Sequence, residues 1–470
     1  MQLRYPRIVI SALRGGVGKT VVSLGIIKGW QNKGLTIASF KKGPDFIDAS
    51  WLKEGSGRPC YNLDTFLIDK QSVFNSFIQR AQGADGSVVE GNRGLYDGMD
   101  QQGSHSTAVL AKLLKIPIVL VVDCAKTTRT AAALVLGCQK MDRGLNINGV
   151  VLNQIAGKRH ASIIRSSIEQ KCKIPVLGEI PRLKEFPFKE RHMGLTPPQE
   201  IQRTEDYFNF CEALGKNYLD LERLWQVALG APDLTPPERM GKSKKKGLLP
   251  SVRIGVIRDS AFQFYYPENL EALENHGGQI VEISALKDKE LPPVDALYIG
   301  GGFPETHLEM LADNASFRRS LYQAIEDGLP VYAECGGAMY LGESVLIKNK
   351  TFPMVGVFPV VFTLDEKPCG HGYTILKSDV VSPYYKKGTT LKGHEFHYSR
   401  IEAWKSDQVC FTFTVKRGFG FDGRRDGLCY KNVLSTYTHI HALGEKRWAN
   451  AMVRQAELFK EKGLIPNVSK

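Results

Sequence analysis

The sequence has no apolar run long enough to cross a membrane. Its strongest run, residues 116–122, has the length of a strand, whereas a membrane-spanning helix needs about 20 apolar residues. Residues 1–10 hold a basic pair but only a short apolar stretch before Ser11, which argues against a secretory signal. The nine cysteines include no CxxC pair. We therefore expect neither a zinc module nor a disulfide scaffold, and we expect a reducing, cytoplasmic setting.

Internal repeats and low-complexity tracts are also missing, and the composition is that of a globular protein. Hydrophobic residues make up 43% and charged residues 24% of the chain, both ordinary values. At about 100–200 residues per domain, the 470 residues predict two or three domains. Lys and Arg outnumber Asp and Glu by 62 to 49, a net charge of +13. This excess predicts an anionic partner but does not distinguish nucleic acid from phosphate or a polycarboxylate.

The first half alternates strand-like runs with helical stretches, which is typical of a parallel α/β sheet. Strands are expected at residues 7–12, 37–40, 87–90, 117–123 and 149–153. A proline-rich, lysine-rich stretch, residues 231–250, interrupts the pattern, and a second α/β pattern begins at Arg253. We predict a first α/β domain over residues 1–235, a linker over 236–251 and a second α/β domain over 252–470. The alternative interpretation of the basic linker is a segment that binds nucleic acid.

A glycine-rich loop follows the first strand. Residues 11–20 read Ser-Ala-Leu-Arg-Gly-Gly-Val-Gly-Lys-Thr, and glycines at such a position let backbone N–H groups surround phosphate oxygens. Lys19 is expected to reach the outer phosphates and the Thr20 hydroxyl to bind Mg²⁺. The expected ATP-binding residues are Arg14, Gly15, Gly16, Val17, Gly18, Lys19, Thr20 and, for adenine, Asn153. Because Leu13 replaces the usual first glycine, the loop resembles that of MinD/ParA-like and dethiobiotin-synthetase-like ATPases.

Carboxylates stand where two further strands should end. Asp45 and Glu90 follow strand-like runs, and ligands of open parallel sheets bind at the carboxyl ends of the strands. We predict that Thr20, Asp45 and Glu90 hold Mg²⁺, which prefers oxygen ligands. The alternative is structural, with Asp45 in a turn and Glu90 as a capping group.

The second domain contains a cysteine in an unusual setting. Cys335 follows a hydrophobic strand and precedes Gly336 and Gly337, as in a nucleophile elbow. A thiol at a helix N-terminus is expected to have a lowered pKa. Backbone N–H groups of Gly301, Gly302 and Gly336 are candidates for a substrate pocket that stabilises an oxyanion, and His439 and His441 are candidate bases. The alternative, a cysteine that is simply buried, does not explain the glycines and histidines around it.

Several longer stretches resemble the cobyrinic acid a,c-diamide synthase family nearly from end to end. They are residues 42–48, 62–64, 90–98, 191–195, 258–267, 300–305, 334–339, 393–399 and 436–439. The resemblance implies a dethiobiotin-synthetase-like ATPase domain joined to a class I glutamine amidotransferase domain. It also implies Cys335 as nucleophile and His439 as base. His441 stands where triad amidotransferases carry an acid, so a Cys–His dyad is expected and the group that orients His439 is left open.

The resemblance implies that ATP phosphorylates a carboxylate of a tetrapyrrole and that ammonia from glutamine displaces the phosphate. Cobyrinic or hydrogenobyrinic acid is the first candidate acceptor, and sirohaem and nickel sirohydrochlorin are alternatives. The residues predicted to position the acceptor are Asp45, Phe46, Ile47, Leu95, Tyr96 and Asp97. We expect no nucleic-acid or membrane partner, and a homodimer is left open. The rival interpretation is a ParA-like ATPase switch on DNA, which the elbow cysteine argues against.

Overall fold

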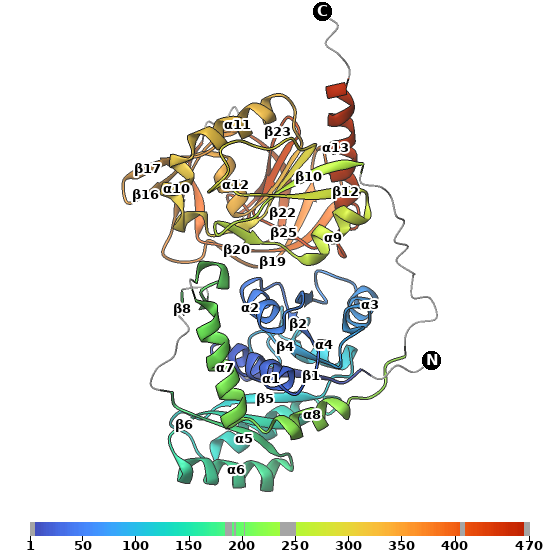
Figure 1. Ribbon diagram of the computed structural model, residues 1–470, viewed down its shortest axis with the longest axis vertical. Helices are drawn as coiled ribbons and strands as arrows, with labels where there is room; N and C mark the ends of the chain where they lie inside the picture. Colours follow the sequence, from blue (N-terminus) through green and yellow to red (C-terminus); the bar gives the residue numbers. More distant parts are fainter. Residues whose placement is uncertain are drawn as a thin grey trace, which may run out of the picture. The chain divides into compact units, whose positions relative to one another are not determined.

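The computed structural model describes residues 5–183, 190–191, 194–201, 203–235, 251–404 and 409–464. The chain divides into two compact units, Met1–Lys242 and Ser243–Lys470, coloured blue to green and yellow to red in Figure 1. The expected linker, residues 236–251, lies outside the described residues except for Ser251. In the described part of the chain, no helix is both long enough and apolar enough to cross a membrane.

A seven-stranded sheet forms the centre of the N-terminal unit. Its strands lie in the order β3-β2-β4-β1-β5-β6-β7, and every neighbouring pair is parallel. The strands are β1 (Arg7–Ala12), β2 (Ile37–Lys42), β3 (Tyr61–Leu63), β4 (Gly86–Glu90), β5 (Ile118–Asp123), β6 (Ile147–Ile155) and β7 (Val176–Pro181). The central strands are buried along almost their whole length, because helices cover both faces of such a sheet.

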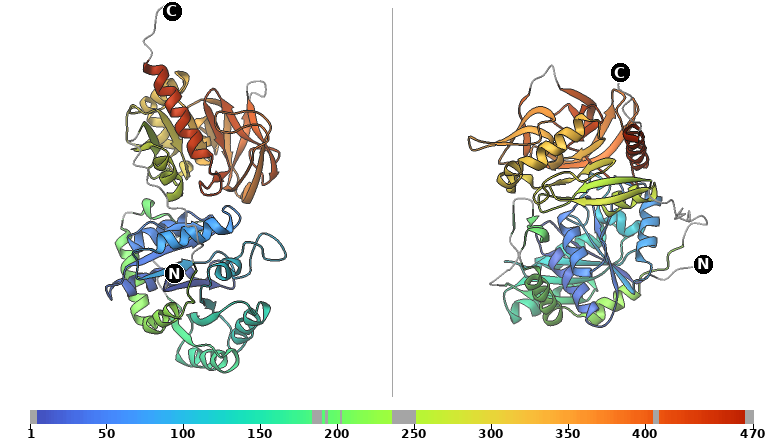
Figure 2. Two further views of the ribbon diagram at one scale, coloured as in Figure 1. Left: turned by 90° about the vertical axis from the view of Figure 1, so that its right-hand side faces the viewer. Right: turned by 45° about the horizontal axis from the view of Figure 1, so that its top comes forward.

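Helices connect these strands and flank the sheet (Figure 2). They are α1 (Lys19–Gln31), α2 (Ile47–Ser56), α3 (Lys70–Ala81), α4 (Thr107–Leu113), α5 (Thr130–Met141), α6 (Lys158–Cys172), α7 (Thr204–Tyr218) and α8 (Leu221–Leu229). Three short elements precede α7: β8 (Glu190–Arg191), β9 (Gly194–Leu195) and η1 (Pro198–Glu200). This arrangement confirms the predicted parallel α/β fold of the first half.

The position of β1 in the sheet explains where a ligand would bind. From β1 the chain passes to β2 and β3 on one side of the sheet, and from β4 it passes to β5, β6 and β7 on the other. Open α/β sheets bind ligands at the carboxyl ends of the strands where the winding reverses in this way. The segments that follow β1, β2 and β4 therefore meet at one edge of the sheet.

The C-terminal unit contains a ten-stranded mixed sheet in the order β12-β10-β13-β15-β24-β23-β22-β19-β20-β25. Pairing is parallel from β12 to β24 and antiparallel from there to β25. The strands are β10 (Val252–Ile257), β12 (Gly278–Ile283), β13 (Ala296–Ile299), β15 (Val331–Glu334), β19 (Gly370–Ser378), β20 (Thr390–His397), β22 (Cys410–Arg417), β23 (Arg425–Tyr430), β24 (Val433–Thr436) and β25 (His439–Ile440). The α/β pattern predicted for this half is confirmed.

Smaller sheets and helices complete this unit. A ribbon joins β11 (Phe262–Phe264) to β14 (Gly301–Gly302). A four-stranded sheet contains β16 (Gly342–Ile347), β17 (Lys350–Pro353), β18 (Phe358–Leu364) and β21 (Ser399–Trp404). The helices are α9 (Pro267–Asn275), η2 (Pro304–Thr306), α10 (Leu308–Asp313), α11 (Ala315–Glu326), α12 (Gly336–Leu341) and α13 (Trp448–Leu464). Two hydrophobic clusters, one around Phe317 and one around Trp448, fill the interior.

Candidate active sites

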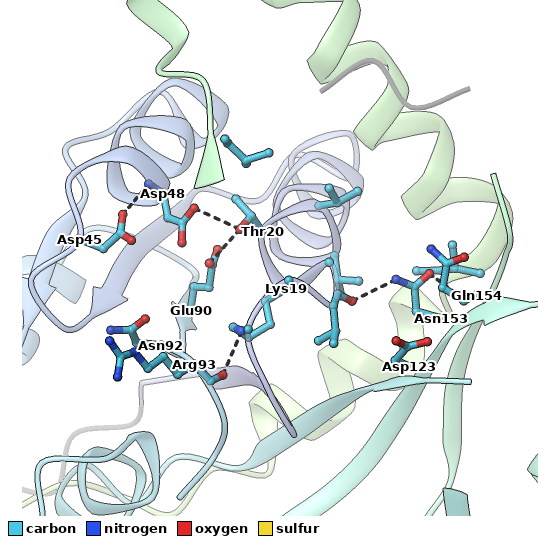
Figure 3. A pocket seen from close by; sticks show the side chains of 18 of the residues that line it. Lys19, Thr20, Asp45, Asp48, Glu90, Asn92, Arg93, Asp123, Asn153 and Gln154 are labelled. Carbon is cyan, nitrogen blue, oxygen red and sulfur yellow. Dashed lines mark hydrogen bonds between the residues drawn. The ribbon is translucent and has the colours of Figure 1, made fainter. Parts of the chain in front are cut away.

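The loop between β1 and α1 borders an open cavity of about 760 Å³ (Figure 3). Gly16 and Gly18 have φ angles of 70° and 88°. Residues other than glycine rarely adopt such positive values. A Cβ built at Gly15 or Gly16 would meet no atom within 4 Å. The loop can therefore approach a ligand with its backbone, as a phosphate-binding loop must.

Lys19 points along this loop. Its Nζ donates to the carbonyl oxygens of Arg14 and Arg93 at 3.3 and 3.0 Å. Burial and the neighbouring Lys41 lower the pKa of Lys19. The Arg14 side chain is mostly exposed and its Nη2 lies 2.6 Å from Asp123 Oδ2. A bound phosphate would give Lys19 the anionic partner that two carbonyl oxygens only partly replace.

Thr20, Asp48 and Glu90 face one another on one side of Lys19 (Figure 3). Thr20 Oγ1 lies 3.0 Å from Glu90 Oε1 and 3.4 Å from Asp48 Oδ1. Glu90 Oε2 is buried with no hydrogen-bond partner. Among the described residues, no group of three or more His, Cys, Asp and Glu side chains could hold a metal ion. A cation site here would thus rest on one hydroxyl and two carboxylates, which are oxygen donors of the kind Mg²⁺ takes.

Lys41 lies between the two carboxylates of this cluster. Its Nζ is 2.6 Å from Asp48 Oδ2 and 2.8 Å from Glu90 Oε1. Although burial works in the opposite direction, Asp48 and Glu90 raise the pKa of Lys41. Burial raises the pKa of Glu90 to about 7 against the effect of Lys41. The pKa of Asp48 is lowered because Lys41 outweighs the effect of burial.

Asp45 has a different place from the one predicted. Its Oδ1 accepts the backbone N–H of Asp48 at 2.8 Å, as a turn residue does, so the structural alternative describes it better than the role of a partner of Thr20. Burial and the nearby Asp48 raise the pKa of Asp45 to about 6. The carboxylate that contacts Thr20 from this segment is Asp48, one helical turn further along. The prediction missed it because both acidic residues follow the same strand.

Asn153 lies on the opposite side of Lys19 together with Gln154 and Asp123 (Figure 3). Its Nδ2 donates to the carbonyl oxygen of Val17 at 3.0 Å, so Asn153 holds the phosphate loop in place. Contact between Asn153 and adenine stays a prediction.

The structure separates the residues predicted to position an acceptor. Asp45 and Ile47 line the cavity, and Phe46 is the half-buried N-cap residue of α2. Leu95 is 1% exposed, so the prediction that it contacts an acceptor is wrong for this conformation. Tyr96 donates its hydroxyl to the Cys138 carbonyl oxygen, and Asp97 accepts the backbone N–H of Gly94. These two contacts stabilise the loop after β4, and neither side chain lines the cavity.

Cys335 occupies a sharp turn between β15 and α12. Its φ and ψ are 50° and −105°, a conformation that costs about 1–3 kcal/mol and persists only where the surroundings impose it. The backbone N–H of Cys335 donates to the Thr436 carbonyl oxygen at 2.7 Å, which helps to fix the turn. The geometry is that of the predicted nucleophile elbow.

Burial, followed by the negative charge of Glu305, raises the pKa of the Cys335 thiol. This direction is opposite to the lowered pKa predicted from the helix N-terminus, so that prediction is wrong. The cause is that Cys335 is only 6% exposed and α12 is short. A thiolate here needs a proton acceptor beside it.

Gly301 separates this cysteine from His439. A Cβ built at Gly301 would lie 2.5 Å from His439 Cε1, 3.2 Å from His439 Nε2 and 3.4 Å from Cys335 Cβ. The same point is therefore next to both side chains, and only glycine leaves room for them. A Cβ at Gly336 would lie 3.2 Å from the backbone nitrogen of Gly302. The predicted glycines Gly301, Gly302 and Gly336 thus surround the elbow, while the Gly300 N–H donates to the Tyr265 hydroxyl.

The two predicted histidines have different partners. His439 Nδ1 lies 3.1 Å from Glu334 Oε2, a contact between residues 105 positions apart that was not predicted. His441 lies beside Glu268, with 3.5 Å between His441 Nε2 and Glu268 Oε1. The ring of His394 stacks on that of His439, and His397 bonds to the Ser399 carbonyl oxygen. His192 lies outside the described residues.

Two family models match the chain, one in each unit. Residues 8–195 match the CobQ/CobB/MinD/ParA nucleotide binding domain. Residues 253–447 match the CobB/CobQ-like glutamine amidotransferase domain. The first match contains the phosphate loop with Thr20 and Glu90, and the second contains Cys335 and His439.

Proteins of known name resemble the chain over nearly its whole length. The cobyrinate a,c-diamide synthase of Magnetococcus marinus is 40% identical over 467 residues, which cover 98% of this chain and 99% of that one. The enzyme of the same name from Archaeoglobus fulgidus is 39% identical over 461 residues, 97% of this chain and 98% of its own. A crystal structure of glutamine amidotransferase covers 43% of this chain and 98% of its own, with 17% identity and a TM-score of 0.33.

Replacing Lys41 by Met should destabilise the N-terminal unit strongly. The change leaves the buried carboxylates of Asp48 and Glu90 without their shared cation, which costs about 3–5 kcal/mol of unfolding free energy. The matched control is Lys33→Ala, which removes a pair with Glu222 whose side chains are 47% and 65% exposed and costs less than about 1 kcal/mol. Urea unfolding followed by tryptophan fluorescence measures both, and equal losses would contradict the role of Lys41.

Replacing Gly301 by Ala should slow glutamine hydrolysis by at least about 10²-fold, because a methyl group there displaces the His439 ring and misplacement of about 1 Å can have that effect. The measurement is the initial rate of glutamate formation from glutamine. An unchanged thermal unfolding temperature would show that the effect is local. A folded variant with the original hydrolysis rate would contradict the geometry.

Proposed function

This chain belongs to the cobyrinate a,c-diamide synthase family, and from that premise we propose that it uses ATP and glutamine to amidate the a- and c-acetate groups of cobyrinate. One observation carries the proposal: a single chain contains both a phosphate-binding loop beside Thr20, Asp48 and Glu90, and a strained cysteine beside a histidine. Amide formation from a carboxylate needs an activated acid and a source of ammonia. The two units each suit one of these needs.

The N-terminal unit activates the acid. Arg14, Lys19 and the backbone of residues 15–18 bind the phosphates of ATP, and the carboxylate oxygen of the acceptor attacks the γ-phosphorus. ADP leaves, and an acyl phosphate remains. Lys19 neutralises charge on the transferred group, which is the main task of a protein in phosphoryl transfer.

Thr20, Asp48 and Glu90 would hold Mg²⁺ in this unit. The buried Glu90 Oε2, which lacks a hydrogen-bond partner, supports a cation there, and so does the hard-oxygen donor set. When bound, Mg²⁺ supplies positive charge to the phosphates. Lys41 keeps Asp48 and Glu90 in position by its contacts of 2.6 and 2.8 Å.

The C-terminal unit releases ammonia. The Cys335 sulfur adds to the amide carbonyl carbon of glutamine while His439 takes the thiol proton. Backbone N–H groups near Gly302 and Gly336 stabilise the oxyanion. The proton then passes to the departing nitrogen, ammonia leaves, and water hydrolyses the thioester to glutamate. Ammonia adds to the acyl phosphate carbon, and phosphate departs.

Cobyrinate is the acceptor that the named relatives favour. For the alternative acceptor sirohaem, the candidate distinguishing positions are residues 41–42, Trp51 and residues 57–60. Trp51 is fully buried and donates to the Thr196 carbonyl oxygen, and Cys60 is also buried. Trp51 and Cys60 therefore do not contact an acceptor directly, and neither side chain favours sirohaem.

Product masses test the proposed function. Incubation with cobyrinate, ATP, Mg²⁺ and glutamine should yield a product with two added amides, because the a- and c-acetates are both targets. Parallel incubations with sirohaem and nickel sirohydrochlorin should yield little amide under the same conditions. Amidation of either alternative in preference to cobyrinate would change the assigned acceptor, and no amide on any of the three would refute the proposal.

Two substitutions should give opposite patterns. Cys335→Ser should reduce glutamine-driven synthesis by at least about 10³-fold but leave synthesis from free ammonia intact, because the thiol acts only on glutamine. Lys19→Ala should reduce synthesis from both nitrogen sources by about 10²-fold or more, because both need the acyl phosphate. The measurement is product formation with glutamine and with ammonium chloride. Equal loss from both sources in Cys335→Ser would contradict the division of labour.

A further inference from the structure

We propose that Glu334 is the positioning residue that orients His439, so that a Glu–His–Cys relay replaces the expected dyad. This inference rests on the proposed function of the C-terminal unit. His441 stands where triad amidotransferases carry an acid, two residues after the catalytic histidine. The structure brings a carboxylate to His439 from another element, the strand that ends immediately before Cys335.

Glu334 contacts His439 on the nitrogen that faces away from the cysteine. Glu334 Oε2 lies 3.1 Å from His439 Nδ1, and the side chains are 1% and 3% exposed. The other ring nitrogen, Nε2, lies next to Gly301 on the side of Cys335. A carboxylate that accepts the Nδ1 proton fixes the tautomer in which Nε2 can take a proton. It also stabilises the imidazolium that forms when His439 accepts the proton of Cys335.

Two further donors hold the Glu334 carboxylate in place. The Tyr298 hydroxyl donates to Oε2 at 3.2 Å and the backbone N–H of Ile440 donates to Oε1 at 3.2 Å. Burial, followed by the charge of Glu334, raises the pKa of Tyr298, so Tyr298 keeps its proton and acts as a donor. With His439, three donors converge on the Glu334 carboxylate and fix its position.

The other titratable groups near His439 have partners of their own. Glu395 accepts the backbone N–H groups of Phe419 and Gly420, and Asp426 accepts the Thr436 hydroxyl and the Tyr437 N–H. Burial, followed by His439, lowers the pKa of the stacked His394, so His394 is neutral and supplies no negative charge.

His441 cannot substitute for the missing acid. Its Nδ1 accepts the backbone N–H of Leu443 at 3.2 Å, and its Nε2 faces Glu268. The His441–Glu268 pair is thus a second buried His–carboxylate pair in the same unit. It provides a matched control, because Glu268 is 2% exposed and is not part of the proposed machinery.

Glu334→Gln tests the relay. The amide keeps the shape of the side chain but loses its charge and can force the wrong His439 tautomer. We expect the kcat for glutamine hydrolysis to fall by about 10²–10⁴-fold, while the KM for glutamine changes less than about threefold. The difference in kcat between Glu334→Gln and the unaltered protein should become smaller as the pH rises, because hydroxide can then take the proton of the Cys335 thiol. Glu334→Asp, which keeps the charge, should recover part of the rate.

Glu268→Gln is expected to keep the original hydrolysis rate. Ammonia-driven synthesis should stay at the original level in all three variants, which shows that the N-terminal unit works. The inference would be overturned if Glu334→Gln left kcat unchanged or raised only the KM for glutamine. It would also be overturned if the loss of kcat were no greater than that in Glu268→Gln. If the unaltered protein does not hydrolyse glutamine at all, the proposed function fails instead.

A measurement on the unaltered protein covers the case in which Glu334→Gln does not fold. In ¹⁵N spectra of histidine-labelled protein, the signals that disappear in His439→Asn belong to His439. They should show a protonated Nδ1 and an unprotonated Nε2 in the resting protein. The opposite tautomer would overturn the role of Glu334.

Discussion

Both sites depend on a buried carboxylate at the end of a parallel strand. Because water does not reach such a carboxylate, its cationic or proton-donating partners must come from the protein. Glu90 ends β4 and is 0% exposed, and Glu334 ends β15 and is 1% exposed. Removing one partner from a buried ionic contact costs several kcal/mol. The cationic or proton-donating partners, Lys41 for Glu90 and His439 for Glu334, are therefore held in defined places. Each carboxylate organises its site before any ligand binds.

The same strand ends explain why each unit can perform one half of the chemistry. In the N-terminal unit the switch point beside β1 gathers the phosphate loop, Asp48 and Glu90 around a cavity. In the C-terminal unit the turn after β15 places Cys335 in a strained conformation next to Gly301 and His439. The strain of that turn is opposed by the parallel pairing of β15 with β24, including the bond from Cys335 N–H to Thr436. Rigid strands thus fix groups that loops alone would leave imprecise.

The fold and most of the site positions could be predicted because they depend on local pattern. Apolar runs bounded by glycine or charge located β1 and β5, and the carboxyl-end rule located Glu90. The features that could not be predicted depend on contacts between residues far apart in the sequence, on local helix geometry or on burial. Asp48 was missed because the choice between it and Asp45 is decided by the first turn of α2. Glu334 was missed because its partner His439 is 105 residues away. The direction of the Cys335 pKa was wrong because desolvation outweighs a short helix.

The placement of the acid beside the nucleophile has a mechanical consequence. Where an acid follows the catalytic histidine by two residues, histidine and acid move together and the cysteine lies on a separate strand. Here the acid and the cysteine are consecutive residues at the end of β15, so the group that orients the base is tied to the nucleophile itself. Any shift of β15 moves Glu334 and Cys335 together and carries the His439 ring along through Nδ1. The distance between thiol and base is then protected against small movements of β25, a strand of only two residues. A short, peripheral strand can carry the base because its alignment is set from the central sheet.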